Sequence, residues 1–344
     1  MNEETTLIAE TAERLFADLS TPETVNAAEQ GTWPAALWDA FAETGLGSIL
    51  VPESLGGAGG DVAHAAAILR AAARHAVPAP VAETMLAGWV AGMTGIVVPD
   101  GPASFAVGRG GHDGPRLHDG RLTGCLHRTP WGRAVETLVV VIDGAVALVP
   151  TGDAGLVEGR NLAGEPRDDL TFDDVPVAAA AAAEGLDAVR AYRLGALFRA
   201  VQIAGGLERI LEMAVQYAGE RKQFGRPLAK FQAIQHQLAI LAGQTTAANA
   251  ATDAAVAAVG SKAEDFAVAA AKARASEAAG EGAAIAHQVH GAMGFTHEHS
   301  LHQVTRRLWS WREEFGNEAV WTGHLGRAIA AGGADALWPT IVGA

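Results

Sequence analysis

Positive charge gathers in one short stretch of this acidic chain, from Glu220 to Ala239, which reads ERKQFGRPLAKFQAIQHQLA. Four basic side chains surround a Phe-Gly corner in this stretch: Arg221, Lys222, Arg226 and Lys230. Basic residues at a helix end ordinarily complement the helix dipole, which accounts for Arg221 and Lys222 but not for Gln223–Phe224–Gly225. A guanidinium beside a tight turn, an exposed aromatic ring and a glutamine suit a ligand with a diphosphate and a ring system. The stretch therefore predicts a site for such a ligand.

A second polar stretch, AHQVHGAMGF, runs from Ala286 to Phe295. Its small residues, from Gly291 to Gly294, allow a ligand to approach the backbone closely. A turn that merely ends a helix would explain the glycines, but it would not explain Gln288 or the polar residues around it. We interpret this stretch as a second part of a binding site.

Other motifs favour structural roles. Five histidines stand close together in the sequence: His287, His290, His297, His299 and His302. They have no cysteine nearby and no zinc-type helical motif, and a glycine turn interrupts their spacing, so we predict no metal site. The only cysteine, Cys125, is flanked by strand-like residues without an adjacent base, which predicts a buried structural thiol.

The glycine-rich segment VGRGGHDG, which ends at Gly114, superficially resembles a phosphate-binding loop. A nucleotide loop of that type lies between a strand and a helix, whereas here Pro115 and a strand-like segment follow. We predict a plain hairpin loop from Gly108 to Gly114.

The elements that must position these residues fall into three zones. Helical periodicity covers residues 1–97, where a loop rich in glycine ends at Asp61, a residue suited to cap the next helix. Residues 98–180 consist of short apolar runs separated by Gly, Asp and Pro, which is typical of a small antiparallel β barrel or sandwich. Residues 181–344 contain long alanine-rich helices with breaks at Phe224–Pro227 and Gly291–Gly294, which predicts a four-helix bundle. The fold class is thus mostly α with a central β domain.

Composition excludes several classes of protein. The 344 residues carry a net charge of -14, which argues against binding to nucleic acid or to an anionic membrane. A single cysteine rules out a disulfide framework within the chain and suits a reducing cytoplasm. The acidic, amphipathic start is unlike a signal peptide, and the apolar runs are too short to span a membrane. These features predict a soluble cytoplasmic protein.

Three ordered motifs resemble those of the acyl-CoA dehydrogenase family. The basic stretch is similar to the family's ERxxFGxxLxxxQxxxxxLA, and QVHGAMGFTHEHSLHQVTRR to its QxxGGxGFxxExxxxRxxRD. Near the N-terminus, FAETGLGSILVPESLGGAGGD is similar to the family's GxxGxxxxxxPExxGGxG. The resemblance spans nearly the whole chain, and it implies an N-terminal helical domain, a β domain and a C-terminal four-helix bundle.

The resemblance also implies FAD as cofactor and a CoA thioester as substrate. In such enzymes a carboxylate removes the α-proton while the β-hydrogen leaves as hydride to the flavin. The family's diphosphate-binding positions correspond to seven residues of this chain, and the resemblance implies that some of them reach the FAD of a neighbouring subunit. The seven are Arg221, Gln223, Phe224, Gln232, Gln288, Gly291 and Ala292. Ala292 replaces the family's second glycine. The implied partners are an electron-transfer flavoprotein or similar acceptor and further chains in a homo- or hetero-oligomer, a dimer or tetramer.

The catalytic half of the family pattern is eroded. Phe315 stands where many members carry the catalytic Glu, and Glu314 is the nearest carboxylate. The alternative base position falls at Gly195, and the arginine expected beside it is Ala196. In the β domain, the flavin-contacting Trp and Thr correspond to Arg128 and Pro130, and the serine-containing loop before them is missing.

Two hypotheses follow from this erosion. In one, the chain is a self-sufficient flavoenzyme whose base has moved to Glu314. In the other, which chain length and the missing base favour, it is one subunit of a heteromeric dehydrogenase for bulky or sterol-derived CoA esters, and a partner supplies the base. An FAD-free structural homologue and a different flavin reaction, such as nitroalkane oxidation or hydroxylation, remain alternatives at this stage.

Overall fold

The computed structural model describes residues 3–108, 113–142 and 144–342, and it divides into two compact units. The first unit contains residues 1–72 and 77–195, and the second contains residues 73–76 and 196–344. Helices come first, strands follow, and helices return, so the order predicted from the sequence is confirmed. Among the described residues, none of the helices combines the length and the apolar character that a membrane span requires.

The helices of the first unit precede its strands and are short. They are α1 (Glu3–Leu19), α2 (Pro22–Glu29), α3 (Ala35–Glu43), α4 (Val62–Arg74), which crosses the unit boundary, and α5 (Val81–Gly92), with one-turn helices η1 (Leu46–Ser48) and η2 (Glu53–Leu55). The predicted cap of α4 is confirmed, because Asp61 Oδ1 accepts hydrogen bonds from the backbone N–H groups of Ala63 (2.9 Å) and His64 (3.0 Å).

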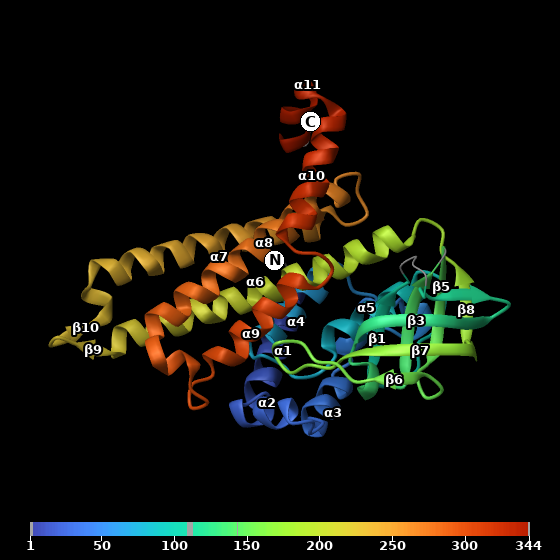
Figure 1. The fold of residues 1–344 in the computed structure, drawn as a ribbon, viewed down its shortest axis with the longest axis horizontal. Coiled ribbons are helices and arrows are strands. Elements are labelled where there is room, and N and C mark those ends of the chain that lie inside the picture. Colours follow the sequence, from blue (N-terminus) through green and yellow to red (C-terminus); the bar gives the residue numbers. More distant parts are fainter. Residues whose placement is uncertain (1–2, 109–112, 143, 343–344) are drawn as a thin grey trace. The chain divides into compact units, whose positions relative to one another are not determined.

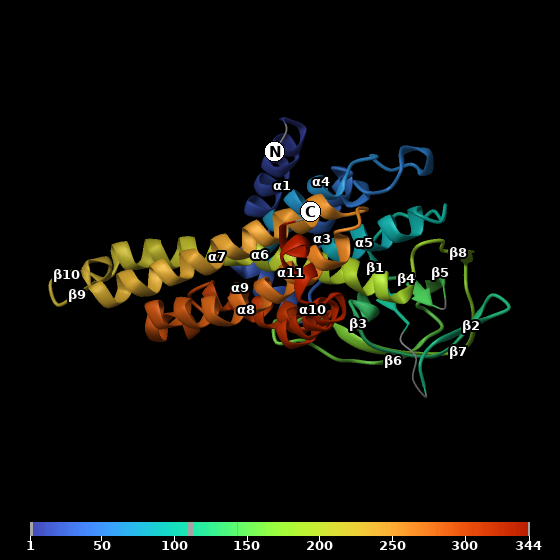
Figure 2. The ribbon, with the colours of Figure 1, turned by 90° about the horizontal axis from the view of Figure 1, so that it is seen from above.

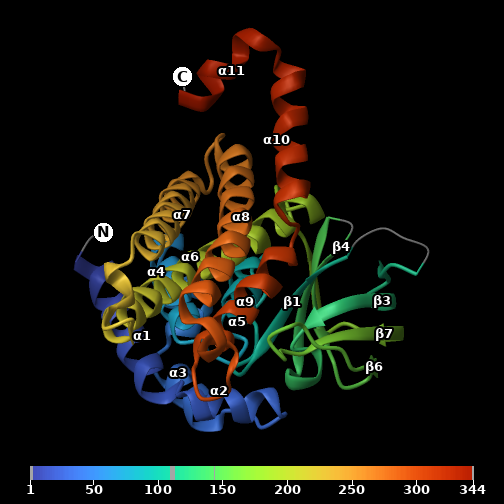
Figure 3. The same cartoon turned by 60° about the vertical axis from the view of Figure 1, so that its left-hand side comes forward.

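The strands of this unit form two four-stranded sheets (Figure 3). One has the order β1 (Ala103–Val107), β4 (Thr137–Ile142), β5 (Ala145–Pro150), β8 (Ala179–Ala182); the other has the order β2 (Arg116–His118), β3 (Arg121–Pro130), β7 (Arg167–Pro176), β6 (Gly155–Val157). Apolar side chains of β3 and β7 pack with those of β4 and β5 in one buried core. The described strands therefore make a sandwich and do not close into a barrel.

One strand prediction is wrong, and another falls largely outside the described residues. The β1–β4 pair is parallel, whereas the sequence predicted a wholly antiparallel domain. The hairpin loop predicted at Gly108–Gly114 includes residues 109–112, which lie outside the described residues. The described strands on either side of it, β1 and β2, belong to different sheets. A strand does follow it, as predicted, and not the helix that a nucleotide loop needs.

The second unit is built on four long helices lying side by side (Figure 2). They are α6 (Ala188–Glu220), which enters this unit at residue 196, α7 (Gln232–Ala258), α8 (Glu264–His290) and α9 (Leu301–Glu313). Glycine allows the close packing: a Cβ on Gly206 would lie 2.8 Å from Leu308 Cδ2, and one on Gly282 would lie 2.8 Å from Leu207 Cδ2. Helix α10 (Glu318–Gly332) packs against α8, where His324 Nε2 lies 2.9 Å from Asp265 Oδ2, and α11 (Ala334–Val342) follows α10 (Figure 1).

Short connections place four helix termini at one end of this bundle (Figure 1). A small hairpin of β9 (Lys222–Gln223) and β10 (Arg226–Pro227), followed by the one-turn helix η4 (Leu228–Lys230), joins α6 to α7. The one-turn helix η5 (Gly291–Phe295) leads from α8 toward α9. The hairpin and η5 therefore lie at the same end.

Candidate functional site

The seven predicted cofactor-binding residues lie at this end of the bundle. Arg221 directly follows α6, Gln223 and Phe224 are in the hairpin, and Gln232 is the first residue of α7. Gln288 is in the last turn of α8, and Gly291 and Ala292 begin η5. All seven are exposed. The ends of α6 and α8 are held together by Tyr217, whose ring stacks on His290 with 4.5 Å between centroids.

The hairpin presents its aromatic tip in a strained conformation. Gln223 pairs with Arg226, and the two tip residues, Phe224 and Gly225, both have positive φ (50° and 79°). Two-residue turns of this kind favour Asn-Gly, because a left-handed conformation costs a residue with a bulky side chain roughly 1–2 kcal/mol. Phe224 is also 92% exposed. An aromatic side chain that is exposed to solvent on a strained backbone indicates a functional role for the ring.

The base of the hairpin is well fixed. The backbone N–H of Leu228 donates to the carbonyl of Arg221 (2.8 Å), and the Arg226 guanidinium lies 4.2 Å from the centre of the Phe231 ring. This contact occupies Arg226 with the residue directly before α7. Arg221 is exposed at the end of α6, so its guanidinium is well placed for an anion.

Replacing Phe224 with asparagine separates hairpin stability from function. We expect Phe224→Asn to leave the free energy of unfolding unchanged or raise it by about 0.5–1 kcal/mol, because asparagine tolerates the left-handed conformation. Flavin retention should nevertheless fall, because the exposed ring is lost. Urea unfolding of the variant measures its stability, and flavin absorbance after gel filtration with a co-expressed partner chain measures flavin retention. A variant that is less stable and keeps its flavin would contradict this role for Phe224.

The turn at η5 is open to a ligand on one side and tightly packed on the other. Gly291 has φ 59° and ψ −141°, and a Cβ there would meet nothing within 4 Å. Gly294 is buried, and a Cβ there would lie 3.1 Å from both His287 Nδ1 and His290 Cβ. The open side thus offers backbone and the Gln288 amide to a diphosphate, so the residues at this end fit the cofactor that the sequence implies.

The predicted base, Glu314, is held in a buried ion pair. Its Oε2 lies 2.7 Å from both Nε and a terminal nitrogen of Arg199, and the two side chains are only 13% and 3% exposed. Arg199 also donates to Gln202 Oε1 (2.6 Å). Because protonation of Glu314 would leave this buried guanidinium without its counter-charge, the carboxylate is poorly suited to accept a substrate proton.

Phe315 is the residue that the resemblance to the family aligns with the base of many members. Its backbone is left-handed (φ 54°), and its carbonyl accepts a hydrogen bond from Trp321 Nε1 (2.9 Å). A phenyl ring offers no proton acceptor. Gly195, the other possible base position, has no side chain at all. Neither position can remove a proton.

Lys272 fixes the end of the helix that leads to Glu314. Its Nζ donates to the carbonyls of Trp311 (3.1 Å) and Arg312 (2.8 Å) and contacts Ser276 Oγ (3.0 Å). Burial lowers the pKa of Lys272 to about 7. Sequence reasoning missed both Lys272 and Arg199. The only available signal was an isolated charge within an apolar helix, which is rarely buried without a partner.

In the first unit, the prediction of a buried, isolated Cys125 is wrong. The thiol is partly exposed, and its sulfur lies 3.6 Å from His127 Nδ1. Asp169 and Asp113 contact the two ring nitrogens of His127 at 3.1 and 3.0 Å and raise the pKa of this histidine. The sequence interpretation missed His127 because it considered only the residues adjacent to Cys125, whereas side chains two residues apart lie on the same face of a strand.

The two β-domain positions that depart from the family pattern lie in a rigid corner. Arg128 is exposed with a positive φ (52°), and its N–H donates to Asp169 Oδ1 (2.8 Å). Pro130 ends β3, and its carbonyl accepts a hydrogen bond from Ser104. Neither side chain reproduces the ring and hydroxyl that the family places at these positions.

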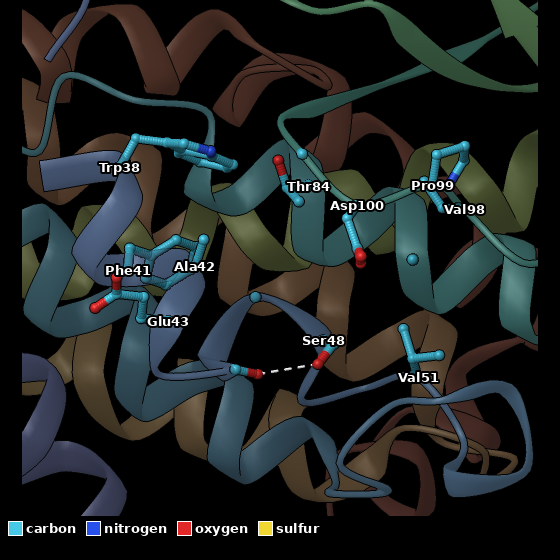
Figure 4. Close-up of a pocket in the computed structure, with 14 residues that line it drawn as sticks. Trp38, Phe41, Ala42, Glu43, Ser48, Val51, Thr84, Val98, Pro99 and Asp100 are labelled. Carbon is cyan, nitrogen blue, oxygen red and sulfur yellow. Dashed lines mark hydrogen bonds between the residues drawn. The ribbon is translucent and has the colours of Figure 1, made fainter. Parts of the chain in front are cut away.

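A pocket of about 470 Å³ lies in the first unit among α3, α5 and the segment before β1 (Figure 4). Trp38, Phe41 and Val51 give it an apolar wall. Its charged lining residues, Glu43 and Asp100, are both carboxylates, which would repel the phosphates of a CoA ester. The pocket suits an uncharged apolar group.

The histidines near η5 pack against one another and against aromatic rings. His287 stacks on Phe295 with 4.2 Å between ring centroids, and His290 meets His299 at 4.7 Å. Across residues 3–108, 113–142 and 144–342, no group of three or more His, Cys, Asp or Glu side chains is arranged to hold a metal ion.

Comparison with known proteins gives consistent matches along the chain. Residues 187–330 match the family description "Acyl-CoA dehydrogenase, C-terminal domain", and residues 2–97 match "Acyl-CoA dehydrogenase, N-terminal domain". The acyl-CoA dehydrogenase IpdE2 of Mycobacterium tuberculosis is 30% identical over 314 residues, which cover 89% of this chain and 91% of the relative. IpdE2 of Mycolicibacterium smegmatis is 29% identical over 318 residues, covering 89% and 93% of the two chains.

Two solved structures are similar over nearly their whole length. The ChsE4–ChsE5 complex from Mycobacterium tuberculosis contains a chain with a TM-score of 0.89 at 24% identity, covering 97% of this chain and 99% of that one. A variant of the Tcur3481–Tcur3483 steroid ACAD gives a TM-score of 0.86 at 25% identity, covering 96% and 98%.

Proposed function

This chain belongs to the acyl-CoA dehydrogenase family, and from that premise we propose that it is the base-less, cofactor-clasping subunit of a two-chain dehydrogenase. As a member of the family it is an oxidoreductase with FAD as cofactor. The proposed reaction is α,β-desaturation of a CoA thioester. A different chain would supply the carboxylate that removes the α-proton.

The missing base is the observation that carries this proposal. Phe315 and Gly195 stand at the two base positions of the family, and neither has a proton acceptor. The nearest carboxylate, Glu314, is bound to the buried guanidinium of Arg199. A proton acceptor must be within hydrogen-bond reach of the α-carbon and free to take the proton. Nothing at these positions meets both conditions, so the base is assigned to a partner.

The exposed end of the bundle supports a role in holding the cofactor. The guanidinium of Arg221 and the amides of Gln223 and Gln288 are suited to bind the FAD diphosphate, and Gly291 lets the backbone approach it. Bound FAD supplies the acceptor for the hydride that leaves the β-carbon. Because these side chains project from the chain, we assign them to an FAD shared with a neighbouring subunit.

Apolar side chains left in solvent support an oligomer. Helix α7 buries one row of residues, yet its opposite side exposes a second row of small or apolar ones: Ile240, Gly243, Ala247, Ala250, Ala254 and Ala257. Helix α11 exposes Leu337, Trp338 and Ile341. A helix that is apolar on both sides is ordinarily buried on both sides. We therefore expect a dimer or tetramer in which a related chain covers these faces.

The proposed substrate is a bulky, steroid-derived CoA ester. This assignment is supported by the similarity to the Tcur3481–Tcur3483 steroid ACAD. Electrons would pass to an electron-transfer flavoprotein or a similar acceptor. The single cysteine suits the reducing cytoplasm, where we place the enzyme.

Purification with and without a second acyl-CoA dehydrogenase-like chain tests the assembly. We expect the chain alone to be colourless, and the co-expressed pair to elute together and carry yellow FAD. Size-exclusion chromatography with flavin absorbance measures both properties. A yellow homo-oligomer that ignores the second chain would contradict the two-chain proposal.

A further inference from the structure

The η5 turn is backed by a group of rings that the proposed function does not use. We define the histidine cluster as Tyr217 on α6, His287 and His290 on α8, and His299 before α9. Tyr217 stacks on His290 at 4.5 Å and meets His299 edge-on at 6.2 Å. The cluster therefore joins the end of α6, directly before Arg221, to the turn that carries Gly291 and Ala292.

A hydrogen bond at His299 requires a neutral ring, and a hydrogen bond at His290 fixes which nitrogen carries the proton. His299 Nδ1 lies 3.2 Å from the backbone N of Leu301 and accepts the hydrogen bond that caps the start of α9, which a protonated Nδ1 cannot do. His290 Nδ1 donates to the carbonyl of Ala286 (2.7 Å), because a carbonyl can only accept. This leaves the lone pair on His290 Nε2.

Protonation of His290 would be costly as well. The side chain is only 3% exposed, and its Nε2 has no hydrogen-bond partner among the described residues. An added proton would create a buried N–H, and a buried charge, with no acceptor. Gly294 packs directly against this histidine, so movement of the ring would disturb η5.

The electrostatic surroundings also oppose charge on the cluster. Burial lowers the pKa values of His287, His290 and His299, and the neighbouring histidines lower those of His287 and His299 further. Arg209 acts on His299 in the same direction. The hydrogen bond to the Ala286 carbonyl acts on the pKa of His290 in the opposite direction, but burial is the larger effect. The titratable and charged groups that interact with the pair among the described residues are Arg209, Tyr217, His287 and His302, and Glu298 is the sequence neighbour of His299.

We propose that His290 and His299 are positioning residues for the cofactor diphosphate: as neutral rings they hold the η5 turn against the end of α6, and protonation releases it. This inference rests on the proposed function only for its ligand, the diphosphate of FAD. The contact by which the two neutral rings hold η5 against the end of α6, which we call the latch, does not depend on that function. Acid would open the turn and lower the affinity for the cofactor, without any change at the reacting atoms.

The sign of the pH dependence follows from the lowered pKa values. At a pH between the lowered histidine pKa values of the folded protein and the ordinary histidine pKa, these side chains bind more protons in the unfolded chain than in the folded one. The folded state therefore loses stability as the pH falls. The contribution of the pair is complete above the ordinary histidine value of 6.5. It is lost as the pH falls through the lower, folded values.

Hydrogen exchange on the full chain tests the latch without any cofactor. Protection factors for peptides covering residues 286–301 should fall on the order of tenfold between about pH 7.5 and about pH 5.5. In the double variant His290→Phe/His299→Asn, phenylalanine keeps the stacking and the asparagine oxygen replaces the cap acceptor. The fall should then shrink to about twofold or less. His236→Asn, an exposed histidine on α7, serves as the control and should behave as wild type.

An equal acid-induced loss of protection in the wild type and the double variant would overturn the proposal. If the double variant is unfolded at neutral pH, single His299→Asn gives the decision, because it keeps the cap and removes one titrating ring. Flavin retention by the two-chain complex over the same pH range should follow the exchange data. A complex that holds no FAD at any pH would refute the proposed function, while hydrogen exchange would still decide on the latch.

Discussion

Replacing Arg221 with alanine is expected to weaken FAD binding by about 10- to 100-fold in the two-chain complex, because one charge-assisted hydrogen bond contributes about 1.5–3 kcal/mol. The fold should be unaffected. The backbone of Arg221 joins α6 to η4, because its N–H donates to the Tyr217 carbonyl and its carbonyl accepts from the Leu228 N–H (2.8 Å each). Equilibrium dialysis or flavin fluorescence measures the affinity, and circular dichroism monitors the helices.

The matched control for Arg221 is Lys222→Ala. Lys222 is the neighbouring basic residue, is equally exposed, and has no assigned role at the diphosphate. Its loss removes the same charge, so a general electrostatic effect would weaken binding equally in both variants. We expect a change of about threefold or less for Lys222→Ala, since long-range screened charge alone contributes little. If the Arg221→Ala complex keeps its full flavin content after gel filtration, the assignment of Arg221 to the diphosphate site is wrong.

Replacing Glu314 with glutamine is expected to destabilise the bundle by about 3 kcal/mol and to leave proton abstraction intact. The stability loss follows because Arg199, 3% exposed, would be left as a buried charge without its partner. If a partner supplies the base, turnover by the folded complex should stay within a few-fold of wild type. If Glu314 were the base, turnover would fall by about 10²–10⁴-fold.

Two comparisons make the Glu314 result interpretable. Glu313→Gln removes the adjacent carboxylate, whose side chain is 59% exposed, and should change stability by about 0.5 kcal/mol or less. The double variant Arg199→Met/Glu314→Met removes both charges and should recover much of the lost stability, because no unpaired ion remains. Urea unfolding gives the free energies, and acyl-CoA turnover gives the chemistry. Loss of turnover in Glu314→Gln at full folding would identify Glu314 as the base.

Local signals in the sequence were sufficient for the order of elements. The cap at Asp61 and the breaks around Phe224 and Gly291 depend on residues within one or two turns of each other. The same is true of the clustering of both polar stretches at one end of the bundle, because short connections between long helices dictate it. These parts of the fold and of the candidate site could be predicted.

Contacts between distant residues had no comparable signal. Arg199 and Glu314 are 115 positions apart, and nothing in the sequence around either residue indicates that they pair. The parallel pairing of β1 with β4 likewise depends on a crossover, and not on any run of residues. The half-exposed setting of Cys125 depends on which strand lies next to β3. Periodicity reveals which face of an element is apolar, but not which partner covers it.

The most direct test of the central claim is the rate of acyl-CoA desaturation by the purified chain alone, with FAD and an artificial electron acceptor, against the rate of the two-chain complex. We expect no turnover above background from the chain alone and steady turnover from the complex. Replacing the base carboxylate of the partner chain should abolish acyl-CoA desaturation by the complex. Turnover by the chain alone at the rate of the complex would show that its base lies within these 344 residues and would contradict the account.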